Sequence, residues 1–330
     1  MSLDKISHYP VMLEEVKSLI KKPNIIVDST FGGGGYSKDF LKNFQNCKVI
    51  AFDRDKSSET RAEKLANINK SRFTFYNSKF SKIEKFIIND LHNVTHFVYD
   101  LGVSNYQLKN LDRGFSYQNN SELKMTMGIN DIKATNLLNE RDEKFLARII
   151  KLFGDEKDAK KIARNIILFR KNKRIVSSDE LKKIILKSKK KYQKKDPYAQ
   201  TFQALRMVVN QELSEIFYSL KSLMENCSIG TTFIIVSFHS LEDKLVKNIF
   251  NFFGKSMNQS RYLPQIEKKI NFKIFKKRPM VPKLSEIKLN PSSRSAKLRF
   301  IQKINNHKIF INKSDTKMEE FFNLEEKFYE

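Results

Sequence analysis

Three aspartates and one run of four glycines are the residues of this chain whose types and spacing suggest chemistry. Gly32 to Gly35 follow an apolar run that ends at Asp28, and Asp53 and Asp100 each end another apolar run. Glycines let a backbone approach a ligand closely, and a helix that begins directly after them offers free N–H groups. We therefore expect a phosphate-bearing or nucleoside ligand at this place.

The elements that must position these residues alternate between strand and helix. We expect strands at 25–28, 48–52, 73–76 and 96–99, and helices at 10–21, 36–44 and 56–68. This alternation predicts an α/β fold with a parallel sheet and right-handed crossovers. Ligands of such sheets gather at the carboxyl ends of the strands, where Asp28, Asp53 and Asp100 all fall.

Two further positions follow from this arrangement. Asp53 lies 18 residues after Gly35, where a sheet of this kind places the carboxylate that binds a ribose; the alternative is a cap for the next helix. Phe80 follows the third strand, where an adenine ring would lie, although an aromatic residue there also suits an ordinary core.

The alternation stops near Gln107, and the chain up to Pro197 is glycine-poor and helical in pattern. Ser177 to Glu180 predict a helix start and Gly154 a helix end. We interpret residues 107–197 as a helical insertion domain for substrate recognition. The basic run 187–195 suits either phosphate contact or a solvated face.

After the insertion, the pattern returns to the core. We expect one long amphipathic helix at 201–226, strands at 231–238 and 298–301, and a polar tail at 305–330. The α/β core would then comprise 1–106 and 198–304. His239, Ser240 and Glu242 follow the fifth strand, but no G-x-S-x-G turn accompanies them, which argues against a serine hydrolase.

Several ligand classes are excluded by missing patterns. The dinucleotide motif G-x-G-x-x-G fails because its third glycine is Ser37, and the phosphate-loop motif is absent. The five histidines are scattered without ligand spacing, so no metal site is expected. A nucleoside ligand without a pyrophosphate remains, and S-adenosylmethionine fits, with Asp53 on its ribose.

Composition favours a polyanionic partner. The chain has 62 Lys plus Arg against 37 Asp plus Glu, a formal net charge of +25, which favours nucleic acid over a merely solvated surface. Two distant cysteines predict buried thiols in a reducing compartment. We find neither a signal-peptide pattern nor a run of about eighteen apolar residues, so we expect a cytoplasmic protein without a membrane partner.

Eight blocks of this sequence, spread over nearly the whole chain, resemble those of a known family. They include HYPVMLEEV at 8–16, DSTFGGGGYS at 28–37, AFDRD at 51–55, DLGVSNYQL at 100–108, RGFSY at 113–117, TFQALRMVVNQEL at 201–213, SFHSLEDKLVK at 237–247 and NPSSRSAKLR at 290–299. The family is that of the bacterial methyltransferases, formerly called MraW, that methylate N4 of a cytidine in the decoding centre of small-subunit ribosomal RNA. The resemblance implies a class I methyltransferase core, a Rossmann-like sheet, with an inserted all-helical domain.

The resemblance also implies where the cofactor S-adenosylmethionine binds. Carried over by position, its contacts are Gly34, Gly35, Tyr36, Asp53, Phe80, Asp100 and Gln107. Some family positions differ: Tyr36 stands where a histidine is usual, Glu122 to Met127 where P-L-D-M-R-M is usual, and Asp196 where a histidine precedes the proline.

The cofactor already carries an activated methyl group, so the protein must align it with the cytosine amine. We expect the turn from Asp100 to Ser104 to accept hydrogen bonds from that amine, or Asp100 to bind the ammonium group of the cofactor. The partner would be small-subunit ribosomal RNA with an unpaired or flipped base. A methyltransferase for another nucleic acid, an inactive cofactor-binding RNA or assembly protein, and a homodimer stay open.

Overall fold

The computed structural model describes residues 10–104, 107, 113–115, 120–129, 132–189, 196–254 and 270–330. Parts of four sequence features lie outside the described residues: the basic run beyond Lys189, and positions 8–9, 105–106, 108 and 116–117 of the family blocks.

The chain divides into two compact units. The core unit comprises Met1–Gly102 and Glu215–Met318, and the helical unit comprises Val103–Ser214 and Glu319–Glu330. The expected insertion, 107–197, lies within the helical unit. That unit also takes in 198–214 and the C-terminal end of the chain.

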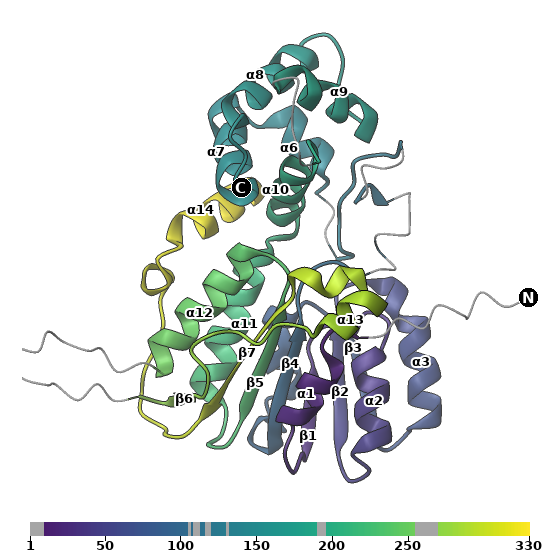
Figure 1. Cartoon of the computed structure of the whole chain (residues 1–330), viewed down its shortest axis with the longest axis vertical. Helices are drawn as coiled ribbons and strands as arrows, with labels where there is room; N and C mark the ends of the chain where they lie inside the picture. Colours follow the sequence, from purple (N-terminus) through teal and green to yellow (C-terminus); the bar gives the residue numbers. More distant parts are fainter. Residues whose placement is uncertain are drawn as a thin grey trace, which may run out of the picture. The chain divides into compact units, whose positions relative to one another are not determined.

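A seven-stranded sheet forms the centre of the core unit (Figure 1), in the order β3-β2-β1-β4-β5-β7-β6. Neighbouring strands from β3 to β5 run parallel, and β7 is antiparallel to both β5 and β6. β1 and β5 are buried along their whole length, as expected for strands covered on both faces. The strands are β1 Ile25–Asp28, β2 Lys48–Asp53, β3 Phe73–Asn77, β4 Val94–Asp100, β5 Thr232–Ser237, β6 Phe272–Ile274 and β7 Lys297–Lys303.

The parallel strands confirm those expected from the sequence, whereas β6 was missed. β6 is only three residues long and lies in a basic stretch, so no alternating pattern of apolar and polar residues predicts it. Helices connect the strands: α2 packs on β2, α3 on β3, and α12 on β5, β6 and β7. The helices of the core unit are α1 Leu13–Leu19, α2 Gly35–Asn43, α3 Glu59–Ile68, α4 Ile83–Ile87, α11 Glu212–Asn226, α12 Ser240–Gly254 and α13 Leu284–Leu289, with short 3₁₀ turns η1 Lys56–Ser58, η2 Phe80–Lys82, η3 Leu91–Asn93, η5 Pro291–Ser295 and η6 Lys313–Thr316.

In the helical unit, α7 packs against α8, α10 and α14. Gly154 ends α7 as expected, and a Cβ there would lie 2.4 Å from the Gln200 carbonyl oxygen, so α7 and α10 approach closely. Ser177 and Glu180 form the capping box that begins α9. The helices are α6 Ala134–Glu140, α7 Glu143–Gly154, α8 Ala159–Arg170, α9 Ser178–Ser188, α10 Ala199–Asn210 and α14 Glu319–Tyr329; the first residues of α11 also belong here.

The expectation of one long helix at 201–226 is wrong. Gln211 has a φ of 51°, a left-handed conformation that ends α10, and α11 starts at the next residue. The buried Glu325 carboxylate from α14 accepts hydrogen bonds from the N–H groups of Leu213 (3.1 Å) and Ser214 (2.8 Å) at this start. A distant residue therefore supports the break, which a local pattern does not reveal.

The C-terminal segment also differs from the polar tail expected at 305–330. α14 buries Phe322, Glu325 and Phe328 against the helical unit, and Arg141 donates a hydrogen bond to the Phe328 carbonyl oxygen. The sparse apolar residues of this segment are spaced for one narrow helical face, which explains why its overall polarity was misleading.

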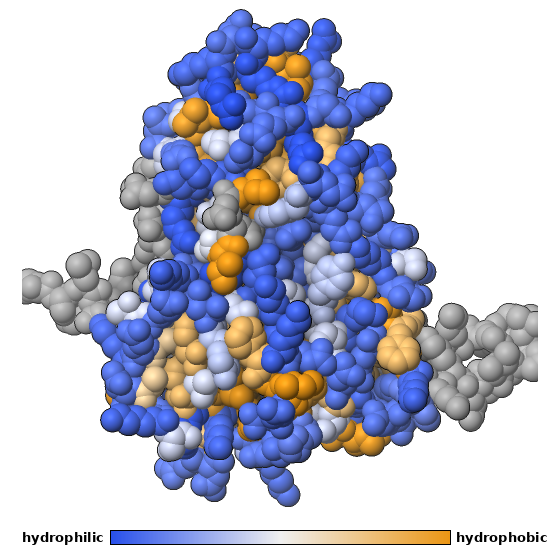
Figure 2. Space-filling model, turned by 180° about the vertical axis from the view of Figure 1, so that it is seen from behind, coloured by the Kyte–Doolittle hydropathy of each residue, from blue (hydrophilic) through white to orange (hydrophobic). Residues whose placement is uncertain are grey.

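Crossing a bilayer requires a long apolar helix, and none of the helices in the described ranges meets that requirement. Seen from behind, hydrophilic residues dominate the surface, and hydrophobic residues occur in small groups (Figure 2). This matches the high proportion of charged residues, 30% of the chain.

Candidate methyl-donor site

The glycine turn after β1 has the geometry that the sequence suggested. Gly34 has a φ of 76° and precedes α2, and an added Cβ would lie 2.7 Å from Cζ of Phe31. A side chain at this position is therefore excluded by both conformation and space. Lys38 makes the first intrahelical bond, to the Gly34 carbonyl (2.9 Å), so the N–H groups of Gly35 and Tyr36 have no acceptor within the helix.

Asp28, at the end of β1, stabilises this turn rather than facing a ligand. Its side chain is fully buried and accepts hydrogen bonds from Oγ of Ser37 (2.6 Å) and from the N–H of Thr30 (3.4 Å). Burial raises the pKa of Asp28 to about 6, although these hydrogen bonds oppose the rise. Asp28 thus fixes the first turn of α2 against the sheet.

Asp53, at the end of β2, holds the glycine turn from the other side. One carboxylate oxygen accepts from the Gly32 N–H (2.7 Å) and from Oγ of Ser58 (3.1 Å), and the other from the Asp55 N–H (2.8 Å). Asp55, not Asp53, caps the following 3₁₀ turn, by accepting from the Ser57 N–H. A carboxylate offers about four acceptor positions, so Asp53 retains room for one more donor.

Asp100, at the end of β4, has a carboxylate oxygen without a hydrogen-bond partner among the described residues. Its Oδ1 atom is buried and has no hydrogen-bond partner among the described residues, while its N–H donates to Oγ1 of Thr30 (2.7 Å). Burial and then the charges of Asp28, Glu242 and Glu286 raise the pKa of Asp100 to about 8. A buried acceptor surrounded by carboxylates is a place where a cation would bind favourably.

Phe80 lies beside this end of β4. It begins η2, and its ring meets the ring of Tyr99 edge to face, with centroids 5.8 Å apart. Oη of Tyr99 is bonded to Oγ of Ser219 (2.7 Å), which fixes the Tyr99 ring. The preceding Lys79 pairs with Glu215 (3.4 Å), and burial lowers the pKa of Lys79. The structure thus places a half-buried aromatic ring against Tyr99, the residue before Asp100.

The Tyr36 side chain lies in the core. It is 4% exposed, and its hydroxyl donates a hydrogen bond to the Val11 carbonyl oxygen. Burial, before any nearby charge, raises its pKa well above the ordinary value. A ligand contact from Tyr36 would therefore have to come from its backbone N–H at the start of α2.

Ser104 and Gln107 belong to the helical unit, as described, and bond to each other. The Ser104 N–H donates to Oε1 of Gln107 (2.9 Å), and the Gln107 N–H donates to Oγ of Ser104 (3.2 Å).

His239, Ser240 and Glu242 form the start of α12. The nearly buried Glu242 accepts from the N–H groups of Phe238 (3.0 Å) and His239 (3.4 Å), and it also contacts Nε2 of His239 at 3.0 Å. Glu242 therefore acts as a cap of this helix, and its charge is one of those that raise the pKa of Asp100.

The departures at 122–127 and at Asp196 lie in the helical unit and have partners there. Glu122 forms ion pairs with Lys124 (3.3 Å) and Lys133 (2.8 Å), and Nδ2 of Asn210 donates to the Met125 carbonyl oxygen (2.7 Å). Asp196 accepts from the Tyr198 N–H (2.9 Å) just before α10.

Sequence reasoning did not single out Glu286, on α13. Its carboxylate accepts a hydrogen bond from the Met12 N–H (2.7 Å), and burial raises its pKa. The available signal was that Glu286 is the one acidic residue in a basic stretch of the sequence.

The sheet order with its antiparallel β7, the glycine turn before α2, and the acidic residues at the ends of β1, β2 and β4 define a class I methyltransferase fold. The chain belongs to the MraW methylase family, whose model matches residues 5–304.

Relatives of similar length support the same assignment. Proteins named ribosomal RNA small subunit methyltransferase H are 41% identical in Ehrlichia canis, 39% in Orientia tsutsugamushi strain Ikeda and 37% in Sulfurihydrogenibium azorense, and they match over 90–91% of this chain and 98–100% of their own length. A solved putative methyltransferase from Streptococcus mutans in complex with SAH is 13% identical over 88% of this chain and 95% of its own, with a TM-score of 0.39. A match that loose identifies neither the fold nor a ligand by itself.

Proposed function

We propose that this protein transfers a methyl group from S-adenosylmethionine to the exocyclic N4 of a cytidine in small-subunit ribosomal RNA, in the decoding centre. The observation that carries the proposal is the family match over 5–304, together with relatives named for that ribosomal subunit along their full length. A cytoplasmic place of action follows from the proposed substrate.

The residues of the core unit fit this cofactor. The unpartnered Oδ1 of Asp100 suits the cationic amino-acid end, and the remaining acceptor position of Asp53 suits a ribose hydroxyl. The backbone N–H groups of Gly35 and Tyr36 suit a carboxylate, and the Phe80 ring suits the adenine. In the helical unit, Gln107 remains the further proposed contact. When bound, S-adenosylmethionine supplies the activated methyl group.

Asp100 is proposed to bind the ammonium group. Burial raises its pKa most, and the negative charges of Asp28, Glu242 and Glu286 raise it further, so a full positive charge nearby would favour the carboxylate. The cytosine amine is neutral before reaction and gains less from such a site. Acceptance of the amine's hydrogen bonds then falls to the backbone of the turn that runs from Asp100 to Ser104.

The alternative assigns Asp100 itself to the amine. An Asp100→Asn variant separates the two roles, because it removes the charge and keeps the shape. Equal losses of cofactor affinity and turnover support the ammonium role. Unchanged cofactor affinity with lost turnover would favour the amine role instead.

Methyl transfer from labelled S-adenosylmethionine tests the function. The acceptors are small ribosomal subunits, partly assembled subunits and free ribosomal RNA, followed by nucleoside mapping. We expect label on N4 of a cytidine in at least one of them. Label on DNA or on another RNA would redirect the proposal to a different substrate. Cofactor binding without transfer to any acceptor would support an inactive binding protein.

A further inference from the structure

The segment 273–299 of the core unit is strongly basic. It contains nine Lys or Arg residues and one acidic residue, Glu286. Lys276, Lys277 and Arg278 are exposed, and none of them forms an ion pair with a residue in the described part of the chain. Clustered cations without an ion-pair partner are suited to phosphate contact.

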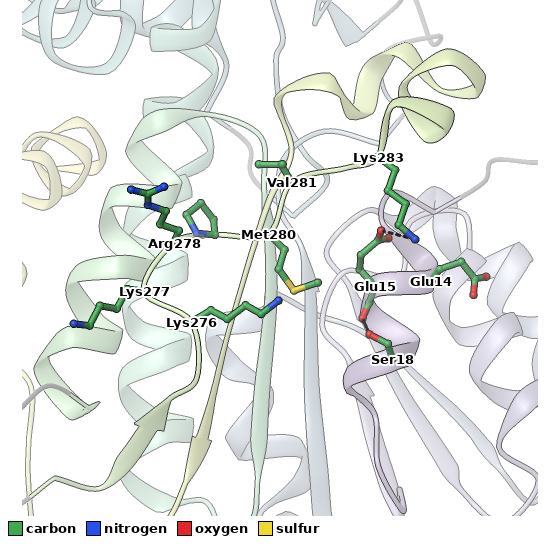
Figure 3. Close-up of a pocket in the computed structure, with 10 residues that line it drawn as sticks. Glu14, Glu15, Ser18, Lys276, Lys277, Arg278, Met280, Val281 and Lys283 are labelled. Atoms are coloured by element: carbon green, nitrogen blue, oxygen red, sulfur yellow. Dashed lines mark hydrogen bonds and ion pairs between the residues drawn. The ribbon is translucent and has the colours of Figure 1, made fainter.

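This segment borders a hollow of about 770 Å³ beside α1. Its lining includes Lys276, Met280, Val281 and Lys283 from the segment and Glu15 from α1. Figure 3 shows Lys276 pointing across the hollow towards α1, whereas Lys277 and Arg278 point to the other side of the segment. Lys283 makes a long ion pair of 3.9 Å with Glu15. Because the Lys283 side chain is exposed, this pair contributes little to stability.

Large apolar side chains are exposed next to these cations. Val281 is 63% exposed, Leu284 78% and Leu289 89%, the last two on α13. Apolar side chains that are this exposed leave water when they pack against the faces of unpaired bases, while neighbouring cations bind the phosphates between those bases. The combination suits single-stranded nucleic acid.

α13 also lies close to the proposed methyl-transfer site. Its Glu286 accepts a hydrogen bond from the Met12 N–H (2.7 Å), and the carbonyl oxygen of the adjacent Val11 accepts one from the hydroxyl of Tyr36, in the first turn of α2 after the glycines. A strand bound along the segment would therefore run near the glycine turn and the start of α2. This proximity favours RNA over an anionic membrane, and α13, with six residues, is too short for an interfacial membrane helix.

We propose that Lys276, Lys277, Arg278, Lys283, Val281, Leu284 and Leu289, together called the α13 surface, bind the single-stranded RNA that flanks the target cytidine. The inference rests on the proposed function for the identity of the RNA. It adds a docking surface on the core unit to the recognition role expected for the helical insertion.

Salt-dependent binding of a short mixed-sequence single-stranded RNA tests the cations. In the full-length variant Lys276→Gln/Lys277→Gln/Arg278→Gln, three phosphate contacts are lost, so the slope of log affinity against log salt should fall by about 2. Affinity at 0.1 M salt should fall by about 10- to 100-fold. The matched control is Lys42→Gln/Lys64→Gln/Lys70→Gln, three exposed lysines on α2, on α3 and after α3, which should change the slope by less than half as much.

Photocrosslinking tests the apolar part. A photoreactive phenylalanine analogue at Leu284, 78% exposed, should crosslink to the RNA, whereas the same analogue at Ile68, 81% exposed on α3, should not. Equal crosslinking at both positions, or an unchanged salt slope in the triple variant, overturns the docking surface. Retention of the protein on phosphatidylglycerol vesicles without RNA binding overturns it too.

The docking surface and the proposed function fail in different ways. If cytidine is methylated and the triple variant keeps the wild-type KM for RNA, the surface is wrong and the function stands. If no RNA is methylated but the triple variant loses RNA affinity while cofactor affinity by calorimetry is unchanged, the surface stands and the function is wrong.

Discussion

Asp100 in the core unit and Glu325 in the helical unit are two carboxyl groups with the same pKa, raised to about 8, and opposite surroundings. Burial is the main cause for both. Glu325 accepts hydrogen bonds from Leu213 and from both the N–H and the hydroxyl of Ser214, whereas Oδ1 of Asp100 has no partner in the described chain.

The difference shows which feature marks a ligand site. A raised pKa alone reports burial, and it is shared by a helix-capping residue and a candidate cofactor ligand. The missing hydrogen-bond partner distinguishes them, because a buried polar atom without a partner costs free energy that a ligand would recover. Asp100 is therefore the group whose loss should affect binding, and Glu325 the group whose loss should affect stability.

The largest expected effect comes from Asp100→Asn. It should weaken S-adenosylmethionine binding by about 1,000-fold, since removal of one partner of a buried charge pair costs about 4 kcal/mol. Calorimetry measures the affinity, with Glu325→Gln as the matched control, which should stay within about twofold of wild type. Comparable losses of cofactor affinity in both variants would show that Asp100 is no more a cofactor ligand than Glu325.

Glu325→Ala should have the largest effect on stability. It leaves the N–H groups of Leu213 and Ser214 without their acceptor, so the free energy of unfolding should fall by about 3 kcal/mol. Urea denaturation followed by circular dichroism measures this. Asp100→Ala, tested without cofactor, should cost far less, and a loss as large as that of Glu325→Ala would show that Asp100 also supports the fold.

The third effect is the pH dependence of stability. Both groups have a folded-state pKa above the ordinary value, so the folded protein holds protons that the unfolded chain releases. Their contribution is complete below about pH 4 and is lost as the pH rises through about 8. Thermal unfolding from pH 5 to 9 should show a falling Tm, and Asp100→Asn should flatten the fall by a few degrees.

Cofactor binding should make Asp100, but not Glu325, release its proton. A bound ammonium group favours the carboxylate, so binding at pH 7 should release close to one proton. Calorimetry in phosphate and in Tris, which differ in ionisation enthalpy, counts the protons. Proton release that persists in Asp100→Asn would assign the linkage to another group.

The smallest expected effect is that of Tyr36→Phe. The variant loses one buried hydrogen bond to the Val11 carbonyl, so the free energy of unfolding should fall by about 1 kcal/mol. Cofactor affinity should not change, because the Tyr36 side chain lies in the core. A loss of affinity above about fivefold would place its hydroxyl in the site after all.

Much of the core unit could be predicted from short-range patterns. The parallel strands, the glycine turn and the positions of Asp28, Asp53 and Asp100 at strand ends follow from apolar runs and their spacing. Features that depend on distant residues were missed. The break at Gln211 is supported by Glu325 more than a hundred positions away, and β6 exists because β7 offers it a partner.

The same holds for the candidate site. The sequence identified the aspartates at the strand ends, but it did not show which of them support the glycine turn and which has an unpaired oxygen. Asp28 and Asp53 already accept hydrogen bonds from Ser37 and Gly32, and Glu286 approaches Asp100 from a segment almost two hundred residues later. Chain spacing carries no information on which of several acceptors stays unpaired.

The class of fold, the family and the edge of the sheet where ligands gather could be predicted from the amino-acid sequence, because these depend on local periodicity and on the order of motifs. Three features became evident only from the tertiary structure: the Tyr36 side chain is core, Glu325 is a cap, and Oδ1 of Asp100 has no hydrogen-bond partner among the described residues. Burial and hydrogen-bond satisfaction depend on all the neighbours of a group, and most of those neighbours are remote in the chain.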